Sequence, residues 1–129
     1  MPPRPFPYTQ RIVIEGDTFD VVVESIAAES VVVRVTGELD LATVPQLERV
    51  LGERPEGRGL VIDLAECTFV DSACVRMLVG VARETEEAGG KAAIVASEPG
   101  VLRVLEITAL DTLVPVHSSV DEALAALSG

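Results

Sequence analysis

One segment decides how this chain folds: Leu60-Val61-Ile62-Asp63-Leu64-Ala65-Glu66-Cys67-Thr68-Phe69-Val70-Asp71-Ser72-Ala73-Cys74. Its first five residues are almost continuously apolar, which is typical of a strand that is covered on both faces. An amphipathic helix is predicted to begin at about Ser72, so Asp71 and Ser72 lie where the strand gives way to the helix. A serine hydroxyl at that position can be a helix cap, a nucleophile or a phosphorylation site. The role of Ser72 therefore determines the function.

Strands and helices alternate on both sides of this segment. Val-rich runs before it predict a hairpin of two strands, and amphipathic stripes and apolar runs predict the other elements. The predicted strands cover residues 11–15, 19–25, 30–36, 60–64, 91–96 and 113–117, and the predicted helices cover 44–53, 72–88, 97–107 and a final stretch from 120 onward. This order predicts an α/β domain with a mixed sheet. We assign residues 19–128 to that domain and the proline-rich residues 1–18 to a partly flexible N-terminal extension.

The composition argues against several classes of partner. The 129 residues fit one domain, and 48% of them are hydrophobic but only 3% aromatic, so an aliphatic core is expected. The formal net charge of -11 argues against nucleic acid and anionic membrane surfaces, because both attract clustered Lys and Arg. No apolar stretch approaches the roughly 20 residues that span a bilayer, and the N-terminus lacks the apolar core of a secretory signal. The chain is therefore expected to be cytoplasmic, with no nucleic-acid or membrane partner.

Catalytic and metal chemistry find little support in the residue pattern. The two cysteines and the single His117 match no zinc-site spacing, so neither a metal nor another cofactor is expected. A nucleophilic Ser72 would need an activating base and an oxyanion hole, yet no Gly-x-Ser-x-Gly turn surrounds it. Glu38 and Asp40 lie two residues apart, where solvated loop charges are a more common explanation than acid–base catalysis. On pattern alone, a helix cap is favoured for Ser72 and a catalytic role is disfavoured.

Three stretches match a known family in order and spacing. They are Val-Thr-Gly-Glu-Leu-Asp-Leu-Ala-Thr at 35–43, the strand that leads into Thr68-Phe69-Val70-Asp71-Ser72, and Val104-Leu105-Glu106-Ile107-Thr108-Ala109-Leu110-Asp111 with the strand and the Glu-Ala-Leu-Ala helix that follow it. With these stretches, residues 19–128 resemble a STAS domain, and specifically the stand-alone anti-sigma-factor antagonists of bacteria. The resemblance implies an α/β fold with a mixed four- to five-stranded sheet and about four helices packed mainly on one side.

The resemblance also implies a role in transcription regulation and the stress response by partner switching. In this family the serine after the aspartate, here Ser72, is phosphorylated by an anti-sigma factor with serine-kinase activity. The unphosphorylated antagonist binds that anti-sigma factor and frees the sigma factor, and a metal-dependent serine phosphatase acting on phospho-Ser72 restores this form. The chain itself is thus expected to be a phosphoprotein and not an enzyme. The residues expected to bind the partner around Ser72 are Asp40, Glu38, Asp71, Ala73, Cys74 and Arg76.

One departure from the family pattern concerns the residues after Ser72. The family usually has Asp-Ser-Ser-Gly or Asp-Ser-Thr-Gly, whereas this chain has Asp71-Ser72-Ala73-Cys74. The missing second hydroxyl leaves Ser72 as the one hydroxyl of this run. The Cys74 side chain is expected to crowd the approach of a kinase, and its thiol offers a redox-sensitive site as a further interpretation. The alternative function is a STAS accessory subunit of a transport complex, since some STAS domains support transport without phosphorylation.

Overall fold

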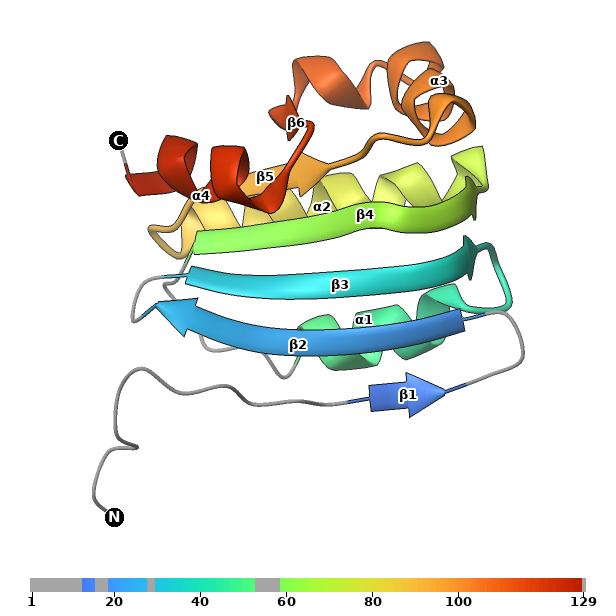
Figure 1. Ribbon diagram of the computed structural model, residues 1–129, viewed down its shortest axis with the longest axis horizontal. Coiled ribbons are helices and arrows are strands. Elements are labelled where there is room, and N and C mark those ends of the chain that lie inside the picture. The colour runs from blue at the N-terminus through green and yellow to red at the C-terminus, as the bar shows by residue number, and fades with distance from the viewer. Residues whose placement is uncertain (1–12, 16–18, 28–29, 53–58, 129) are drawn as a thin grey trace.

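The structure is a computed structural model, and it describes residues 13–15, 19–27, 30–52 and 59–128. A six-stranded mixed sheet forms its centre (Figure 1). The strands are β1 (Val13–Glu15), β2 (Phe19–Ala27), β3 (Ser30–Leu39), β4 (Gly59–Val70), β5 (Ala92–Val95) and β6 (Val116–His117). β1 to β3 pair antiparallel and β3 to β6 pair parallel, in the order of the sequence. The predicted α/β fold with a mixed sheet is confirmed, and the short β1 and β6 bring the sheet to six strands by extending its two edges.

Helices cover the two faces of the sheet unequally. Within the described ranges the helices are α1 (Val44–Gly52), the 3-10 turn η1 (Ser72–Cys74), α2 (Val75–Glu87), α3 (Pro99–Ile107), the 3-10 turn η2 (Leu110–Thr112) and α4 (Val120–Ser128). Figure 1 shows α1 and α2 behind the sheet and α4 in front of it. Val33 and Ile62 belong to the core that α1, α2 and α3 cover, whereas Val32 and Val61 pack with Ala123 of α4 on the other face. The expectation that helices lie mainly on one side is confirmed.

β3 and β4 run further than predicted and end side by side. The sequence predicts strands that end at Thr36 and Leu64, but β3 continues to Leu39 and β4 to Val70. Two register shifts interrupt the ladder between them, and they disturb the apolar alternation from which strand length is predicted. Gly37 lies at one of these shifts with a φ of 97°, a value that suits glycine. Because Leu39 pairs with Val70, the residues that follow the two strands lie together at the carboxyl ends of the parallel strands. This end of the sheet is the edge referred to below.

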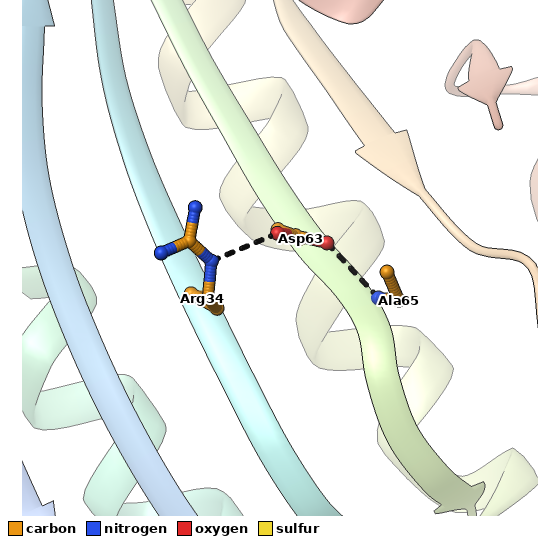
Figure 2. A network of polar contacts seen from close by, with 3 residues as sticks. All are labelled: Arg34, Asp63 and Ala65. Carbon is orange, nitrogen blue, oxygen red and sulfur yellow. Dashed lines mark hydrogen bonds and ion pairs between the residues drawn. The ribbon is translucent and has the colours of Figure 1, made fainter. Parts of the chain in front are cut away.

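An ion pair joins the neighbouring strands β3 and β4 (Figure 2). Nε of Arg34 on β3 donates to Oδ2 of Asp63 on β4 at 3.1 Å, and Oδ1 of Asp63 accepts the backbone N–H of Ala65 at 2.9 Å. Asp63 is only 5% exposed. Both of its carboxylate oxygens nevertheless have partners, which is the condition under which a buried charge is tolerated.

The last predicted strand is shorter in the structure, where β6 contains only Val116–His117. The backbone N–H groups of Leu113 and Val114 donate to the carbonyl of Leu110 at 2.9 Å each, so neither is available to a sheet ladder. Pro115 has no N–H group to donate. The strand therefore begins only after the proline. Across the described ranges, no helix is both long enough and apolar enough to cross a membrane.

Candidate functional site

Asp40 connects β3 to α1 and caps the turn between them. Its Oδ1 accepts the backbone N–H groups of Ala42 at 2.9 Å and of Thr43 at 3.1 Å. The Thr43 hydroxyl accepts the N–H of Asp40 at 2.9 Å and donates to the carbonyl of Glu38 at 3.1 Å. The half-buried Asp40 therefore holds the end of β3 and the start of α1 in a fixed arrangement.

Asp71 has the corresponding position between β4 and α2. Its Oδ1 accepts the backbone N–H of the exposed Ala73 at 2.9 Å, so Asp71 is the residue that caps the following turn. That turn is η1 (Ser72–Cys74), and α2 begins at Val75 and not at Ser72 as predicted. Asp and Ser are both good capping residues, so the sequence alone does not distinguish them. The interpretation of Ser72 as the cap is wrong.

Ser72 is exposed at the start of η1. Its hydroxyl makes no hydrogen bond to any residue that the structure describes, because Asp71 already satisfies the backbone at this turn. The hydroxyl also lies at the N-terminal end of the helical segment that continues as α2, where a negative group is stabilised by about 0.3–1 kcal/mol when exposed. An anionic group attached to Ser72 would therefore break no contact within the described fold.

Backbone contacts bring the two junctions together at one edge of the sheet. The N–H of Asp71 donates to the carbonyl of Leu39 at 2.9 Å, so Asp71 is tied to the residue directly before Asp40. Asp40 and Asp71 are both half-buried. Glu38, near the end of β3, and Arg76, in the first turn of α2, are exposed. Three acidic side chains and the basic Arg76 therefore lie near the ends of β3 and β4 that lead to Ser72.

The expectation that the Cys74 side chain crowds the approach of a kinase to Ser72 is wrong. Its side chain is 1% exposed, and its Sγ donates to the carbonyl of Leu39 at 3.7 Å. The side chain therefore packs in the core beneath the junction and offers no surface to a partner. Burial, and then the charges of Asp71 and Asp40, raises the pKa of the Cys74 thiol. A higher pKa makes the reactive thiolate scarcer, which argues against the redox-sensitive interpretation.

Two large apolar side chains near the junctions are not among the predicted site residues. Leu41 is 67% exposed and follows Asp40, and Phe69 is 48% exposed near the end of β4. Leu41 also lines an open groove of about 520 Å³ between α1 and α2, together with Ala73. We call this the α1–α2 groove. An apolar residue next to a polar turn is the sequence signal for Leu41, because exposed apolar surface often marks a protein-binding site.

The chemistry available at this edge is that of an exposed hydroxyl. In the part of the chain that the structure describes, no three His, Cys, Asp or Glu side chains gather in a way that could hold a metal ion. His117, the base that a nucleophilic serine would need, lies on β6 beside Val95, and Val95 in turn pairs with Asp63 far from the end of β4. No histidine therefore lies beside Ser72 to activate it.

Three comparisons with known proteins point to the same family. The family model described as "Mlab, STAS domain" matches residues 22–115. The anti-sigma-B factor antagonist of Staphylococcus aureus is 32% identical over 91 residues, which cover 69% of this chain and 84% of that protein. An anti-sigma factor antagonist from Mycobacterium paratuberculosis is 27% identical, with a TM-score of 0.71 and coverage of 93% of this chain and 94% of that one.

A third protein shares the fold at lower sequence identity. The Bacillus cell fate determinant SpoIIAA, in its phosphorylated form, is 23% identical with a TM-score of 0.60, and the match covers 82% of this chain and 97% of that chain. The segment matched by the family model extends from β2 to the residues just before β6, so it contains both junctions and Ser72. The chain belongs to the STAS domain family, in which its relatives are anti-sigma factor antagonists.

Proposed function

We propose that this protein is a non-catalytic anti-sigma factor antagonist and that Ser72 switches it between two binding states. With Ser72 unmodified, the protein binds a cytoplasmic anti-sigma factor with serine-kinase activity and frees the sigma factor. Phosphorylation of Ser72 by that kinase ends the binding, and a serine phosphatase restores it. The observation that carries the proposal is the exposed Ser72 hydroxyl, which has no partner in the described structure and lies beside the capping residue Asp71.

Simple electrostatics explains how one phosphate could change binding without unfolding the domain. Phosphorylation adds about -1.5 to -2 charge at neutral pH. In the free protein that charge is solvated and lies at the N-terminal end of a helical segment, where it is favourable. In a complex it would face a surface fitted to a neutral hydroxyl, and Asp40 and Asp71 already place negative charge nearby. Burying an unmatched charge costs several kcal/mol, so the phosphorylated form releases its partner.

The surrounding residues receive roles that follow from their exposure. We assign direct partner contacts to Glu38, Ala73 and Arg76, which are exposed. Asp40 and Asp71 each use one carboxylate oxygen within the fold, which leaves the other oxygen for a partner. Cys74 makes no direct partner contact, because its side chain is buried, and it supports the junction from below.

The test is phosphorylation of the purified protein by the serine-kinase anti-sigma factors of its own organism, supplied one at a time with ATP. Intact mass spectrometry is expected to show one added phosphate, and peptide mapping is expected to assign it to Ser72. Ser72→Ala should abolish the modification, whereas Ser97→Ala, at an exposed serine elsewhere, should leave it intact. A phosphate on another residue, or none with any of these kinases, would refute the proposal.

A further inference from the structure

We propose that the α1–α2 groove is a second part of the partner interface, and that it receives an amphipathic helix of the anti-sigma factor with a basic residue opposite Glu48. This inference rests on the proposed function, because it extends the site that begins at Ser72. It names a surface that lies along two helices and is separate from the serine itself.

The groove is continuous with the Ser72 edge. β3 and β4 are parallel and each leads into one of the two helices, so α1 and α2 begin at the same edge of the sheet and run away from it in the same direction. Leu41 and Ala73, which follow the capping residues Asp40 and Asp71, line the near end of the groove. A partner that covers Ser72 therefore lies directly at the entrance to the groove.

The groove has an apolar floor. Eight of the eleven residues that line it are aliphatic, methionine or glycine. Leu51 of α1 and Val81 of α2 are buried in its floor, and the half-buried Val44 and Met77 lie above the core with part of their surface exposed. Apolar side chains spaced three or four residues apart on two neighbouring helices form the kind of seam into which a third helix packs.

Gly80 points to an external occupant of this seam. It lies in the interior of α2, where glycine is less favourable than alanine. A Cβ atom at Gly80 would meet no heavy atom within 4 Å, so packing within the described chain does not require a glycine. Gly52, at the end of α1, also lines the groove and has open space above it. Without side chains at these positions, the backbone of a helix in the groove could approach α2 closely.

The charges favour a basic partner over a second copy of this chain. The groove is lined by Glu48 from the middle of α1, by Glu84 from the last turn of α2, and by Arg76 nearer to Ser72. A second copy would bring the same acidic surplus and a net charge of -11 to the contact. A helix with Lys or Arg opposite Glu48 matches the groove instead, because complementary charges steer and orient protein partners.

The first experiment fills the groove without disturbing the fold. The probe is the anti-sigma factor kinase that phosphorylates Ser72, and the affinity of the unphosphorylated protein for it is measured by calorimetry. Gly80→Leu is expected to weaken binding about tenfold or more, since its side chain occupies the space of the incoming helix. Arg83→Leu, on an exposed part of α2 outside the groove, is the matched control and should bind as the unmodified protein does. Thermal unfolding of both variants verifies that they fold.

The second experiment reverses the charge of Glu48, on the α1 side of the groove. Glu48→Lys is expected to weaken binding about tenfold and to reduce its dependence on salt concentration, because a charge pair with the partner becomes a repulsion. Glu106→Lys makes the same change of charge at an exposed position of α3 and should have little effect.

The outcomes separate this inference from the proposed function. If the unmodified protein binds the kinase and Ser72→Asp releases it, but Gly80→Leu and Glu48→Lys bind normally, the groove proposal is wrong and the switch stands. If no kinase of this type binds or modifies the unmodified protein, the proposed function itself is wrong. Sedimentation that reveals a dimer, lost in Gly80→Leu, would identify a second copy as the occupant and overturn the proposal of a partner helix.

Discussion

The two strand–helix junctions, residues 40–44 and 71–75, are built alike. Each begins with a half-buried aspartate that caps the next turn, and two exposed residues follow it. The fourth residue is buried and its side chain donates to a carbonyl of β3, and the fifth is the valine at which the α-helix begins. The main chemical difference on the surface is the second residue, which is Leu41 in one junction and Ser72 in the other.

Different residues of each junction hold its backbone and determine its surface chemistry. The aspartate and the buried fourth residue hold the backbone, so the exposed second residue is free to differ. One junction presents an apolar side chain to the α1–α2 groove, and the other presents an exposed hydroxyl. The proposed modification of Ser72 would therefore be added to a frame that the sequence builds twice.

The largest expected effect is on partner binding. Ser72→Asp is expected to weaken binding to the anti-sigma factor kinase at least about 100-fold, because the added carboxylate is buried without a matching charge. Leu41→Ser is expected to weaken it only about tenfold, since it removes apolar contact but adds no charge. Isothermal titration calorimetry measures both. Equal losses in the two variants would show that the junctions do not have the different roles proposed here.

The next effect is on stability and compares the two caps. Asp40→Ala is expected to lower the free energy of unfolding by about 2 kcal/mol and Asp71→Ala by about 1 kcal/mol, because the Asp40 carboxylate accepts two backbone N–H groups and that of Asp71 accepts one. Urea unfolding followed by circular dichroism provides the measurement. Glu106→Ala, an exposed change with no cap, should stay within about 0.5 kcal/mol. A larger loss for Asp71→Ala than for Asp40→Ala would contradict the comparison.

A smaller effect, on the pH dependence of stability, is expected from the buried fourth residues, which are Cys74 in one junction and Thr43 in the other. Burial raises the pKa of the Cys67 and Cys74 thiols above the ordinary value. Both thiols are neutral at pH 7, whether the chain is folded or unfolded. Above about pH 8.5 the unfolded chain loses its thiol protons first, so the stability that the neutral thiols contribute is lost as the pH rises.

Cys74→Thr, which copies the other junction, is therefore expected to flatten the alkaline loss of stability. The measurement is the urea midpoint at about pH 7.5 and at about pH 9.5, on either side of the ordinary thiol pKa. Cys67 still titrates in this variant, so part of the loss should persist. An identical loss in the variant and the unmodified protein would show that Cys74 does not contribute to the pH dependence.

The smallest expected effect comes from exchanging the two exposed second residues. The double variant Leu41→Ser and Ser72→Leu is expected to change the free energy of unfolding by less than about 0.5 kcal/mol, because both positions are exposed and neither side chain caps a turn. Thermal and urea unfolding measure the change. A loss above about 1 kcal/mol would mean that one of these side chains also supports the fold.

The sequence predicts the elements well wherever the hydrophobic pattern is unbroken. The apolar run at 91–96 predicts a strand, and β5 lies at Ala92–Val95; α3 begins at Pro99 with Glu98 as its cap. The pattern fails where pairing with a neighbour overrides it. β4 continues to Val70 through two register shifts, and only its partner strand β3 determines where those shifts occur.

For the site, the sequence predicts the location but not the arrangement. The Asp71–Ser72 pair is correctly placed between a strand and a helix, but which residue is the cap depends on hydrogen bonds that appear only in the fold. The direction of the Cys74 side chain depends on the core beneath it. The α1–α2 groove depends on two helices from separate segments that become neighbours because their strands pair, and no local pattern predicts it.

The Arg34–Asp63 pair bears on how the chain avoids aggregation. β2 and β3 are rich in valine, and valine-rich strands tend to stack with other sheets when no helix covers them. Stacking here would require a second sheet to strip water from a guanidinium that is partly exposed and bonded to a buried carboxylate. The pair therefore opposes the stacking of a second sheet on this face of β3 and β4.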